Sequence, residues 1–241
     1  MRYILCIPFI LLATACGKPA GKIIAEIPEA SGISYCSKSD TLIVANDEGS
    51  YYEISRKGKI LERIKLGKYD LEGVVCEDKQ LIFALENKGM LIVDRETGEK
   101  EKVILNTLYN GKKLPLFNKK SGVEGIAKEG NMIYLSKQSK KKKDSFIAVV
   151  KLSPYPAGIV DVIEHRIADT AGLTFHDGYL YMVSDKEDLL IKYDLQKKKT
   201  VQKVKLEKGA WEGIAFDIKG FVYLADDDGR VVKYKKKALG I

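Results

Sequence analysis

One motif recurs five times along this chain, and its spacing limits the folds that the chain can adopt. In each copy a glycine stands among apolar or small residues, as in Leu71-Glu72-Gly73-Val74-Val75. The copies are 41, 52, 47 and 41 residues apart, with their glycines at Gly32, Gly73, Gly125, Gly172 and Gly213. A period of roughly 40 to 50 residues is typical of propellers and solenoids, in which each unit buries its faces against its neighbours.

The runs between these glycines predict the architecture. Four of the repeats contain four short β-type runs separated by Ser, Asp, Gly and Lys clusters, which is the pattern of a propeller blade. The fifth repeat lacks a fourth run, whereas an additional run at residues 23–27 precedes the first glycine. We therefore predict an all-β, five-bladed β-propeller over residues 23–241, in which the N-terminal strand completes the last blade and removes an exposed edge. We expect a monomer.

The N-terminus has the features of an export signal. A positive start, an apolar run too short to span a membrane and a box of small residues end at Cys16. This pattern resembles the bacterial lipoprotein signal, which implies a signal peptide at residues 1–15, a lipidated Cys16 and a tether at residues 16–22. For a cell with two membranes, Gly17 after the cysteine resembles the outer-membrane sorting signal. The alternative is a plain secretory signal with a cysteine there by chance.

Two cysteines remain in the predicted propeller, Cys36 and Cys76. They occupy adjacent positions of the aligned repeats, and in neighbouring strands these positions point to opposite faces. We therefore expect two free thiols. A disulfide is the alternative, because exported proteins enter an oxidising compartment.

Several phrases of the repeats resemble the SdiA-regulated family over nearly all of residues 23–234. They include Ser31-Gly32-Ile33-Ser34, Ala45-Asn46-Asp47-Glu48-Gly49, Val123-Glu124-Gly125-Ile126 and Trp211-Glu212-Gly213-Ile214-Ala215. The resemblance implies a five-bladed propeller similar to the NHL-repeat propellers, with calcium near the central channel and no established activity. Ala171 and Lys137 depart from the family pattern at positions where an acid is expected.

The strand pattern by itself also gathers acids at one end of the channel. The first strand of a blade begins, and the second ends, at the same rim, because the two form an antiparallel hairpin. The carboxylates expected at this mouth are Glu72, Glu124, Glu212, Asp47, Glu86, Asp185 and Asp227, with the ammonium group of Lys137. Like charges so close raise pKa values or require a cation, and calcium takes six to eight oxygen ligands. Alternatively, the three aspartates only begin turns and point to water.

The positive charge of the chain suggests a class of partner. The net charge of +8 suits a surface that faces anionic lipid or an anionic envelope polymer, and the destination implied by the signal argues against nucleic acid. We expect the connector at residues 106–121 and the insertion at residues 138–145 to surround the acidic mouth. Lys140, Lys141, Lys142 and Lys143 would then bind a partner, whereas the alternative is that they are simply solvated.

The sequence contains little that indicates catalysis. It has two histidines, and it lacks a phosphate loop, a dinucleotide fingerprint, a zinc spacing and a complete nucleophile elbow. We therefore favour a lipid-anchored, calcium-binding scaffold that holds an envelope protein or polymer. The alternative is a calcium-dependent hydrolase of lactones or phosphate esters, in which a carboxylate of the rim acts as the base.

Overall fold

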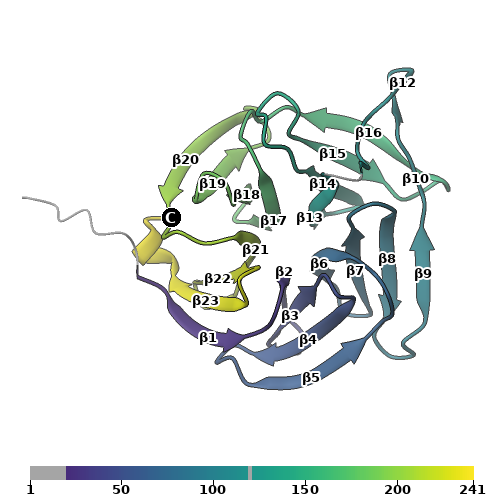
Figure 1. Cartoon of the computed structure of the whole chain (residues 1–241). Helices are drawn as coiled ribbons and strands as arrows, with labels where there is room; N and C mark the ends of the chain where they lie inside the picture. The colour runs from purple at the N-terminus through teal and green to yellow at the C-terminus, as the bar shows by residue number, and fades with distance from the viewer. Residues whose placement is uncertain (1–19, 119–120) are drawn as a thin grey trace, which may run out of the picture.

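A computed structural model describes residues 20–118 and 121–241, and in it five antiparallel sheets stand around a central axis as the blades of a propeller (Figure 1). Blade 1 contains β2 (Ala30–Cys36), β3 (Thr41–Asn46), β4 (Ser50–Ser55) and β5 (Ile60–Lys65). Blade 2 contains β6 (Leu71–Cys76), β7 (Gln80–Leu85), β8 (Gly89–Asp94) and β9 (Lys100–Val103). The predicted all-β propeller is confirmed.

The other three blades repeat this order from the axis outward. Blade 3 contains β13 (Val123–Glu129), β14 (Met132–Lys137), β15 (Phe146–Lys151) and β16 (Ala157–Ile163), with the short β10 (Leu105–Asn106) parallel to β16. Blade 4 contains β17 (Thr170–His176), β18 (Tyr179–Ser184), β19 (Leu189–Asp194) and β20 (Lys199–Lys205). Blade 5 contains β21 (Trp211–Phe216), β22 (Phe221–Asp226), β23 (Arg230–Lys235) and β1 (Lys22–Glu26), and the 3-10 helix η1 (Lys236–Leu239) follows it.

The burial of the strands follows their position in a blade. All six residues of β3 are buried, since an inner strand is covered on both faces, whereas β5 at the outer edge is mostly exposed. Five hydrophobic clusters fill the spaces between neighbouring blades, so each blade depends on two others for its core. Trp211 is fully buried in the cluster between blades 4 and 5, as expected of a core residue.

The ring closes through its first strand, as predicted. β1 pairs antiparallel with β23 and becomes the outermost strand of blade 5, so that segments from both ends of the chain lie side by side (Figure 1). We call the face at which the innermost strands begin the mouth face. The opposite face is the tether face, because Ala20 and the start of β1 lie on it. None of the helices found in residues 20–118 and 121–241 has the length and apolar character needed to cross a membrane.

The expectation of two free thiols is wrong. Cys36 at the end of β2 and Cys76 at the end of β6 form a disulfide, with 5.4 Å between their Cα atoms. Neighbouring blades pack with opposite faces toward each other, so side chains that point to opposite faces of their own sheets can meet in the space between them. Cys36 lies in the cluster between blades 1 and 2, and Cys76 packs against that cluster.

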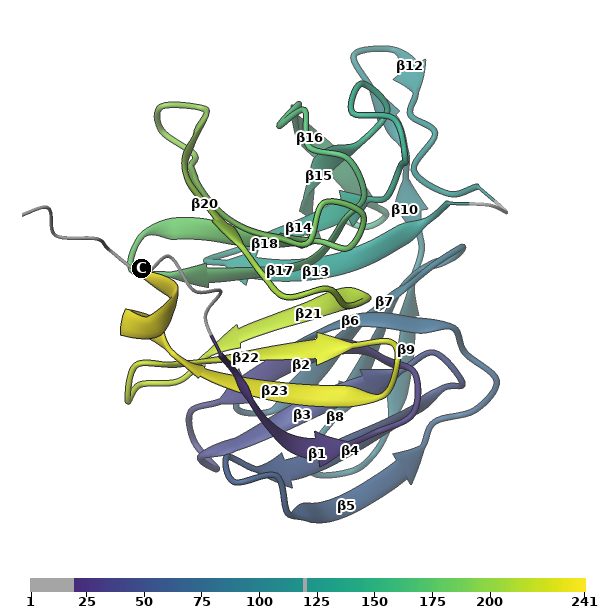
Figure 2. The same ribbon diagram turned by 60° about the vertical axis from the view of Figure 1, so that its left-hand side comes forward.

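The connector at residues 106–121 lies only partly where we expected it, at the acidic mouth. It contains a hairpin of β11 (Leu108–Tyr109) and β12 (Lys112–Lys113), which stands at the outer edge of blade 3 rather than around the mouth (Figure 2). The hydroxyl of Tyr109 donates to Asp161 on β16 at 3.4 Å. Outside the described residues lie Lys119 and Lys120 of this connector, the predicted signal at residues 1–15, Cys16 and the first part of the tether.

Candidate functional site

A β-bulge at the start of every innermost strand forms the base of the site. In each blade the pairing with the second strand shifts by one residue beside the motif glycine. A bulge takes a residue out of the ladder and redirects its side chain. The residues that precede the five glycines at these bulges are Ser31, Glu72, Glu124, Ala171 and Glu212.

The glycines allow these bulges to approach one another closely. A Cβ atom on Gly32 would lie 2.2 Å from the carbonyl oxygen of Glu72, and one on Gly125 would lie 1.9 Å from that of Ala171. Contacts this short exclude any side chain, so the innermost strands converge only because the residue is glycine. The axial cavity that the glycines line holds only about 10 Å³, so the acids stand at the mouth of a nearly closed channel.

A second layer of acids lies where the second strands end. In four blades the residue that follows the second strand from the axis donates its backbone N–H to a backbone carbonyl. The acceptor is the residue three positions before the motif glycine of the same blade. The pairs are Glu86 to Asp70 at 3.4 Å, Gln138 to Gly122 at 3.1 Å, Asp185 to Asp169 at 3.3 Å and Asp227 to Ala210 at 2.9 Å. These hydrogen bonds place the two residues of each pair side by side on the mouth face.

The observed strand pairing changes one predicted position of the site and shows three further acids in it. Gln138, rather than Lys137, takes the place of the acid in blade 3, because Lys137 is still paired with Val123 inside the ladder. Sequence reasoning missed Glu29, Asp70 and Asp169. A signal for them was present, because each of these acids lies three positions before the motif glycine of its repeat.

The predicted carboxylates come together on the mouth face. One carboxylate oxygen from each of Asp70, Glu72 and Glu86 lies within 4.8 Å of the others. The carboxyl groups of Glu72 and Glu124 share a hydrogen bond, and Asp47 makes one with Glu29. Asp47, Asp185 and Asp227 all act electrostatically on Glu212, so the group extends around the axis.

Burial makes these acids weak. It raises the pKa of Glu72 well above its ordinary value, and the nearby carboxylates of Glu124 and Glu212 add to the effect. Burial also raises the pKa of Glu124 to about 7 and that of Glu212 to about 9. The pKa of Asp47 rises to about 7 for the same reason, with Glu29 as the next cause.

The remaining predicted acids shift in the same direction. Burial is the largest cause of a raised pKa at Glu86, at Asp185 and at Asp227, and neighbouring carboxylates add to it in each case. All seven predicted carboxylates therefore hold protons more strongly than they would in water. A cation at the mouth would oppose this shift, because a nearby positive charge favours the ionised carboxylates.

One ammonium group lies beside the acids. Lys137 is 4% exposed, and its Nζ donates to the hydroxyl of Ser121 at 2.7 Å and to the carbonyl of Gln138 at 2.6 Å. Burial lowers its pKa, whereas Glu124 and Glu86 are among the acids that act in the opposite direction. Lys140 and Lys186 also act electrostatically on Asp169, and these three positive charges are fewer than the acids of the mouth.

Two buried carboxylate oxygens at the mouth have no hydrogen-bond donor among the described residues. They are Oδ1 of Asp47 and Oδ1 of Asp169, and Asp169 is only 4% exposed. Buried acceptors of this kind normally have a partner. Together with the glutamates they form a set made only of oxygen ligands, which fits calcium better than a softer metal.

The predicted lysines lie on the same face but turn outward. The insertion at residues 138–145 leaves the end of β14 beside the mouth, and Lys140, Lys141, Lys142 and Lys143 are all exposed. Lys142 pairs with Glu187 at 2.7 Å, and Lys186 donates to the carbonyl of Lys140 at 3.2 Å. The loop is therefore held against the loop of blade 4, and Lys140 is close enough to Asp169 to act on it electrostatically.

Comparisons with known proteins agree with this architecture. A glutaminyl cyclase from Myxococcus xanthus has a similar structure, with a TM-score of 0.65 and 13% identity over 88% of this chain and 94% of that one. BamB from Moraxella catarrhalis matches with a TM-score of 0.44 and 12% identity over 85% of this chain and 57% of that one. No curated protein matches the sequence. A family model described as SdiA-regulated matches residues 18–230, and the chain belongs to this family.

Proposed function

We propose that this protein is a lipid-anchored module of the bacterial cell envelope that binds calcium at its acidic mouth and holds an envelope partner on the mouth face. The observation that carries the proposal is the group of buried carboxylates whose pKa values are raised by burial and mutual repulsion. Ionising these buried, mutually repelling carboxyl groups costs free energy, and a bound dication offsets that cost.

The three carboxylates whose oxygens lie within 4.8 Å of one another, Asp70, Glu72 and Glu86, are the first candidates to hold the ion. Glu124 can contribute because it is hydrogen-bonded to Glu72. When bound, calcium would neutralise the mouth and join blades 2 and 3 through their side chains. Its role in this proposal is structural, since it stabilises the surface on which the partner binds.

A calcium titration of the purified chain tests this step. Glu72→Gln keeps the size of the side chain but removes a charged ligand, so we expect it to weaken calcium binding at least about tenfold. Glu48→Gln is the control, because Glu48 is an exposed acid of the same face. Equal calcium affinity in wild-type protein and in Glu72→Gln would refute the site.

The anchor and the partner surface need separate experiments. Cys16→Ala should release the protein from membranes washed at high salt, and in a cell with two membranes the outer-membrane fraction should contain the wild-type form. Replacing Lys140 to Lys143 by Ser should weaken capture of an anionic envelope polymer while calcium affinity stays nearly unchanged. This capture should also fall with salt, because exposed charges are screened.

A hydrolase of lactones or phosphate esters is the second candidate. The observation in its favour is Glu124, whose pKa of about 7 suits a general base near neutral pH. A screen of lactones and phosphate esters with and without calcium separates the two functions. Calcium-dependent turnover that is lost in Glu124→Gln would replace the scaffold proposal.

A further inference from the structure

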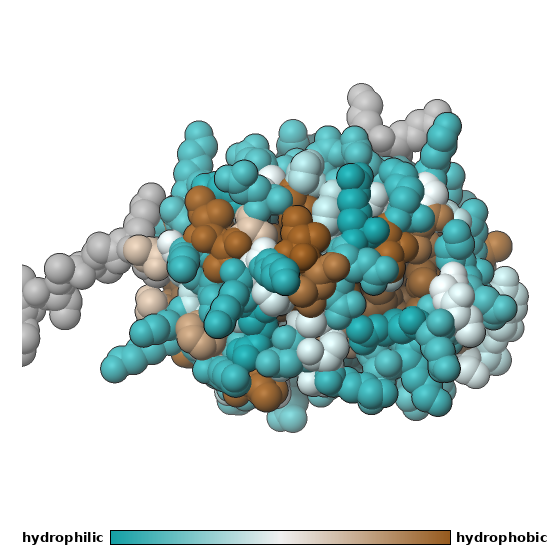
Figure 3. All heavy atoms as spheres, turned by 90° about the horizontal axis from the view of Figure 1, so that it is seen from below, coloured by the Kyte–Doolittle hydropathy of each residue, from teal (hydrophilic) through white to brown (hydrophobic). Residues whose placement is uncertain are grey.

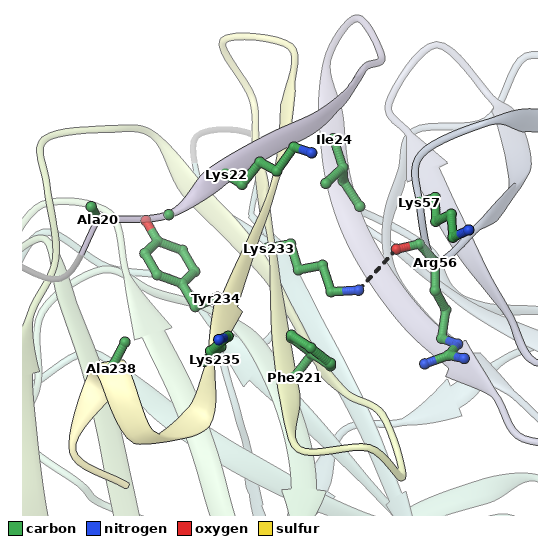
Figure 4. Close-up of a pocket in the computed structure, with 11 residues that line it drawn as sticks. Ala20, Lys22, Ile24, Arg56, Lys57, Phe221, Lys233, Tyr234, Lys235 and Ala238 are labelled. Atoms are coloured by element: carbon green, nitrogen blue, oxygen red, sulfur yellow. Dashed lines mark hydrogen bonds between the residues drawn. The ribbon is translucent and has the colours of Figure 1, made fainter.

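The tether face carries a pocket that the acidic mouth does not use. Its volume is about 580 Å³, which is within the usual range for small-molecule sites. It lies between the edge strand β1 and the turn that joins β4 to β5, so it spans blades 5 and 1 (Figure 4). The apolar part of its wall comes from Ile24, Phe221, Tyr234, Ala20 and Ala238.

The charged residues of this pocket all have the same sign. Lys22, Arg56, Lys57, Lys233 and Lys235 line it, and no acid does. Arg56 is already neutralised, because it pairs with Asp40 at 2.7 Å and with Asp217 at 2.9 Å. An anion in the pocket would therefore meet mainly lysines.

These lysines differ in how free they are. Lys233 reaches across from β23, where its Nζ donates to the carbonyl of Arg56 at 3.1 Å and lies 4.0 Å from the ring centroid of Phe221 (Figure 4). Lys22, Lys57 and Lys235 are exposed, and none of the three forms an ion pair within the described part of the chain. Three positive charges at the pocket are thus without a counter-charge.

Exposed hydrophobic side chains accompany these charges. Ile23 on β1 is 50% exposed, and Ile218, in the turn before β22, is 77% exposed. On the outer edge over β1 and β5, hydrophobic side chains lie among hydrophilic ones (Figure 3). Lysines beside exposed apolar residues are the composition of surfaces that bind at the membrane interface.

The position of the N-terminal segment identifies what would cover this surface. Ala20 and Gly21 are part of the pocket wall, so the described part of the chain begins at this pocket. Ala20 lies only four positions after Cys16, and a fully extended chain over this separation spans about 14 Å. If Cys16 carries lipid, as in the proposed function on which this inference rests, the tether face is held close to the bilayer surface.

We propose that this pocket and its lysines dock on the anionic headgroups of the membrane that anchors the chain. The phosphate of a headgroup pairs with Lys22, Lys57 and Lys235, and the adjoining apolar part of the lipid lies against Phe221 and Tyr234. Ile23 and Ile218 enter the interfacial layer. In this orientation the tether face lies on the bilayer and the acidic mouth points away from it, open to a partner.

Binding of a chain without the lipid anchor to vesicles tests this proposal. Residues 20–241 contain all the strands in the described part of the chain, so a protein that begins at Ala20 retains the whole ring. It should bind vesicles of phosphatidylglycerol mixed with phosphatidylcholine and should not bind vesicles of phosphatidylcholine alone. Inorganic phosphate equal in concentration to the lipid phosphate should not compete, because one free anion lacks the apolar part and the surface potential of a bilayer.

Paired substitutions locate the effect. Each lysine near an anionic bilayer contributes about a fivefold factor to binding, so Lys57→Ser with Lys235→Ser should lower vesicle binding roughly 30-fold. Lys112→Ser with Lys113→Ser removes the same charge from the exposed hairpin at the outer edge of blade 3 and should change binding by less than about twofold. Unchanged calcium affinity in both variants would show that the ring is intact.

The possible failures can be told apart. An equal loss in both double variants would mean that net charge alone drives binding, and it would overturn the proposal. So would failure of the wild-type ring to bind anionic vesicles, or competition by inorganic phosphate. Since this ring lacks Cys16, the failure of the anchor proposal would instead appear as Cys16→Ala that stays with membranes washed at high salt, which screens binding by charge.

Discussion

Replacing Glu212 by Gln reports directly on the protonation of the acidic mouth. Burial, assisted by nearby carboxylates, raises the pKa of Glu212 from its ordinary value of 4.5 to about 9. The native state therefore keeps a proton that the unfolded chain releases. The stability that goes with this proton is complete below about pH 4.5 and is lost as the pH rises through about 9.

The magnitude follows from the pKa difference. Between the two pKa values each unit of pH removes about 1.4 kcal/mol from the free energy of unfolding. Near neutral pH, the loss amounts to about 1 to 3 kcal/mol after allowance for solvent that reaches the mouth. Gln has no charge to desolvate, so metal-free Glu212→Gln should be more stable than metal-free wild-type protein by this amount, with the difference vanishing near pH 4.5.

Urea unfolding followed by tryptophan fluorescence measures this difference. Trp211 is the only tryptophan and is fully buried, so it reports the loss of the core. Saturating calcium should stabilise the wild type more than the variant, because ligand binding adds to the stability of the state that binds it. The reasoning is refuted if metal-free Glu212→Gln is less stable near neutral pH, or if the exposed control Glu48→Gln behaves in the same way.

Three further predictions concern the ring and its charges. Cys36→Ser should lower the free energy of unfolding by about 2 to 4 kcal/mol, because the disulfide closes a loop with a sequence separation of 40, and reduction of the wild type should shift its urea midpoint equally. Gly125→Ala should lower the free energy of unfolding by about 3 kcal/mol, because its Cβ atom would lie 1.9 Å from the carbonyl oxygen of Ala171. Gly158→Ala is the control: no atom lies within 4 Å of its Cβ position, so it should cost less than about 0.5 kcal/mol. Similar losses in thermal or urea unfolding would contradict the close approach of the strands at Gly125. Lys137→Met should tighten calcium binding about tenfold in a titration, because it removes a positive charge beside Glu124 and Glu86, and weaker binding would contradict this placement of the ion.

The ring could be predicted because its signals are local and repeated. A glycine is needed wherever two innermost strands touch, so its recurrence marks the blades before any pairing is known. The closing strand followed from the missing fourth run of the last repeat. The hairpin at the outer edge of blade 3 also had a local signal, since Asn110-Gly111 is a typical two-residue turn with positive φ at both residues, but the connector was treated as a single loop.

One error came from the relation between two sheets, and the other came from the end of one strand. The disulfide of Cys36 and Cys76 could not be predicted from the direction of side chains within one sheet, because the bond forms between facing sheets. Lys137 was placed among the acids because the end of the second strand of blade 3 could not be located from the sequence; Lys137 is the last residue of β14, and Gln138 follows it. The acids at the mouth were largely predictable, since an antiparallel hairpin brings its start and end together whatever the exact register.

Proton release on calcium binding tests the central claim most directly. If calcium displaces protons from Glu72, Glu124 and Glu212, calorimetric titrations in buffers of different ionisation enthalpy should detect at least about one proton released per ion near neutral pH. The release should decrease as the pH approaches the pKa of about 9 of Glu212, where the acids already ionise without metal. Calcium binding without proton release near neutral pH, or no calcium binding at all, would contradict the account.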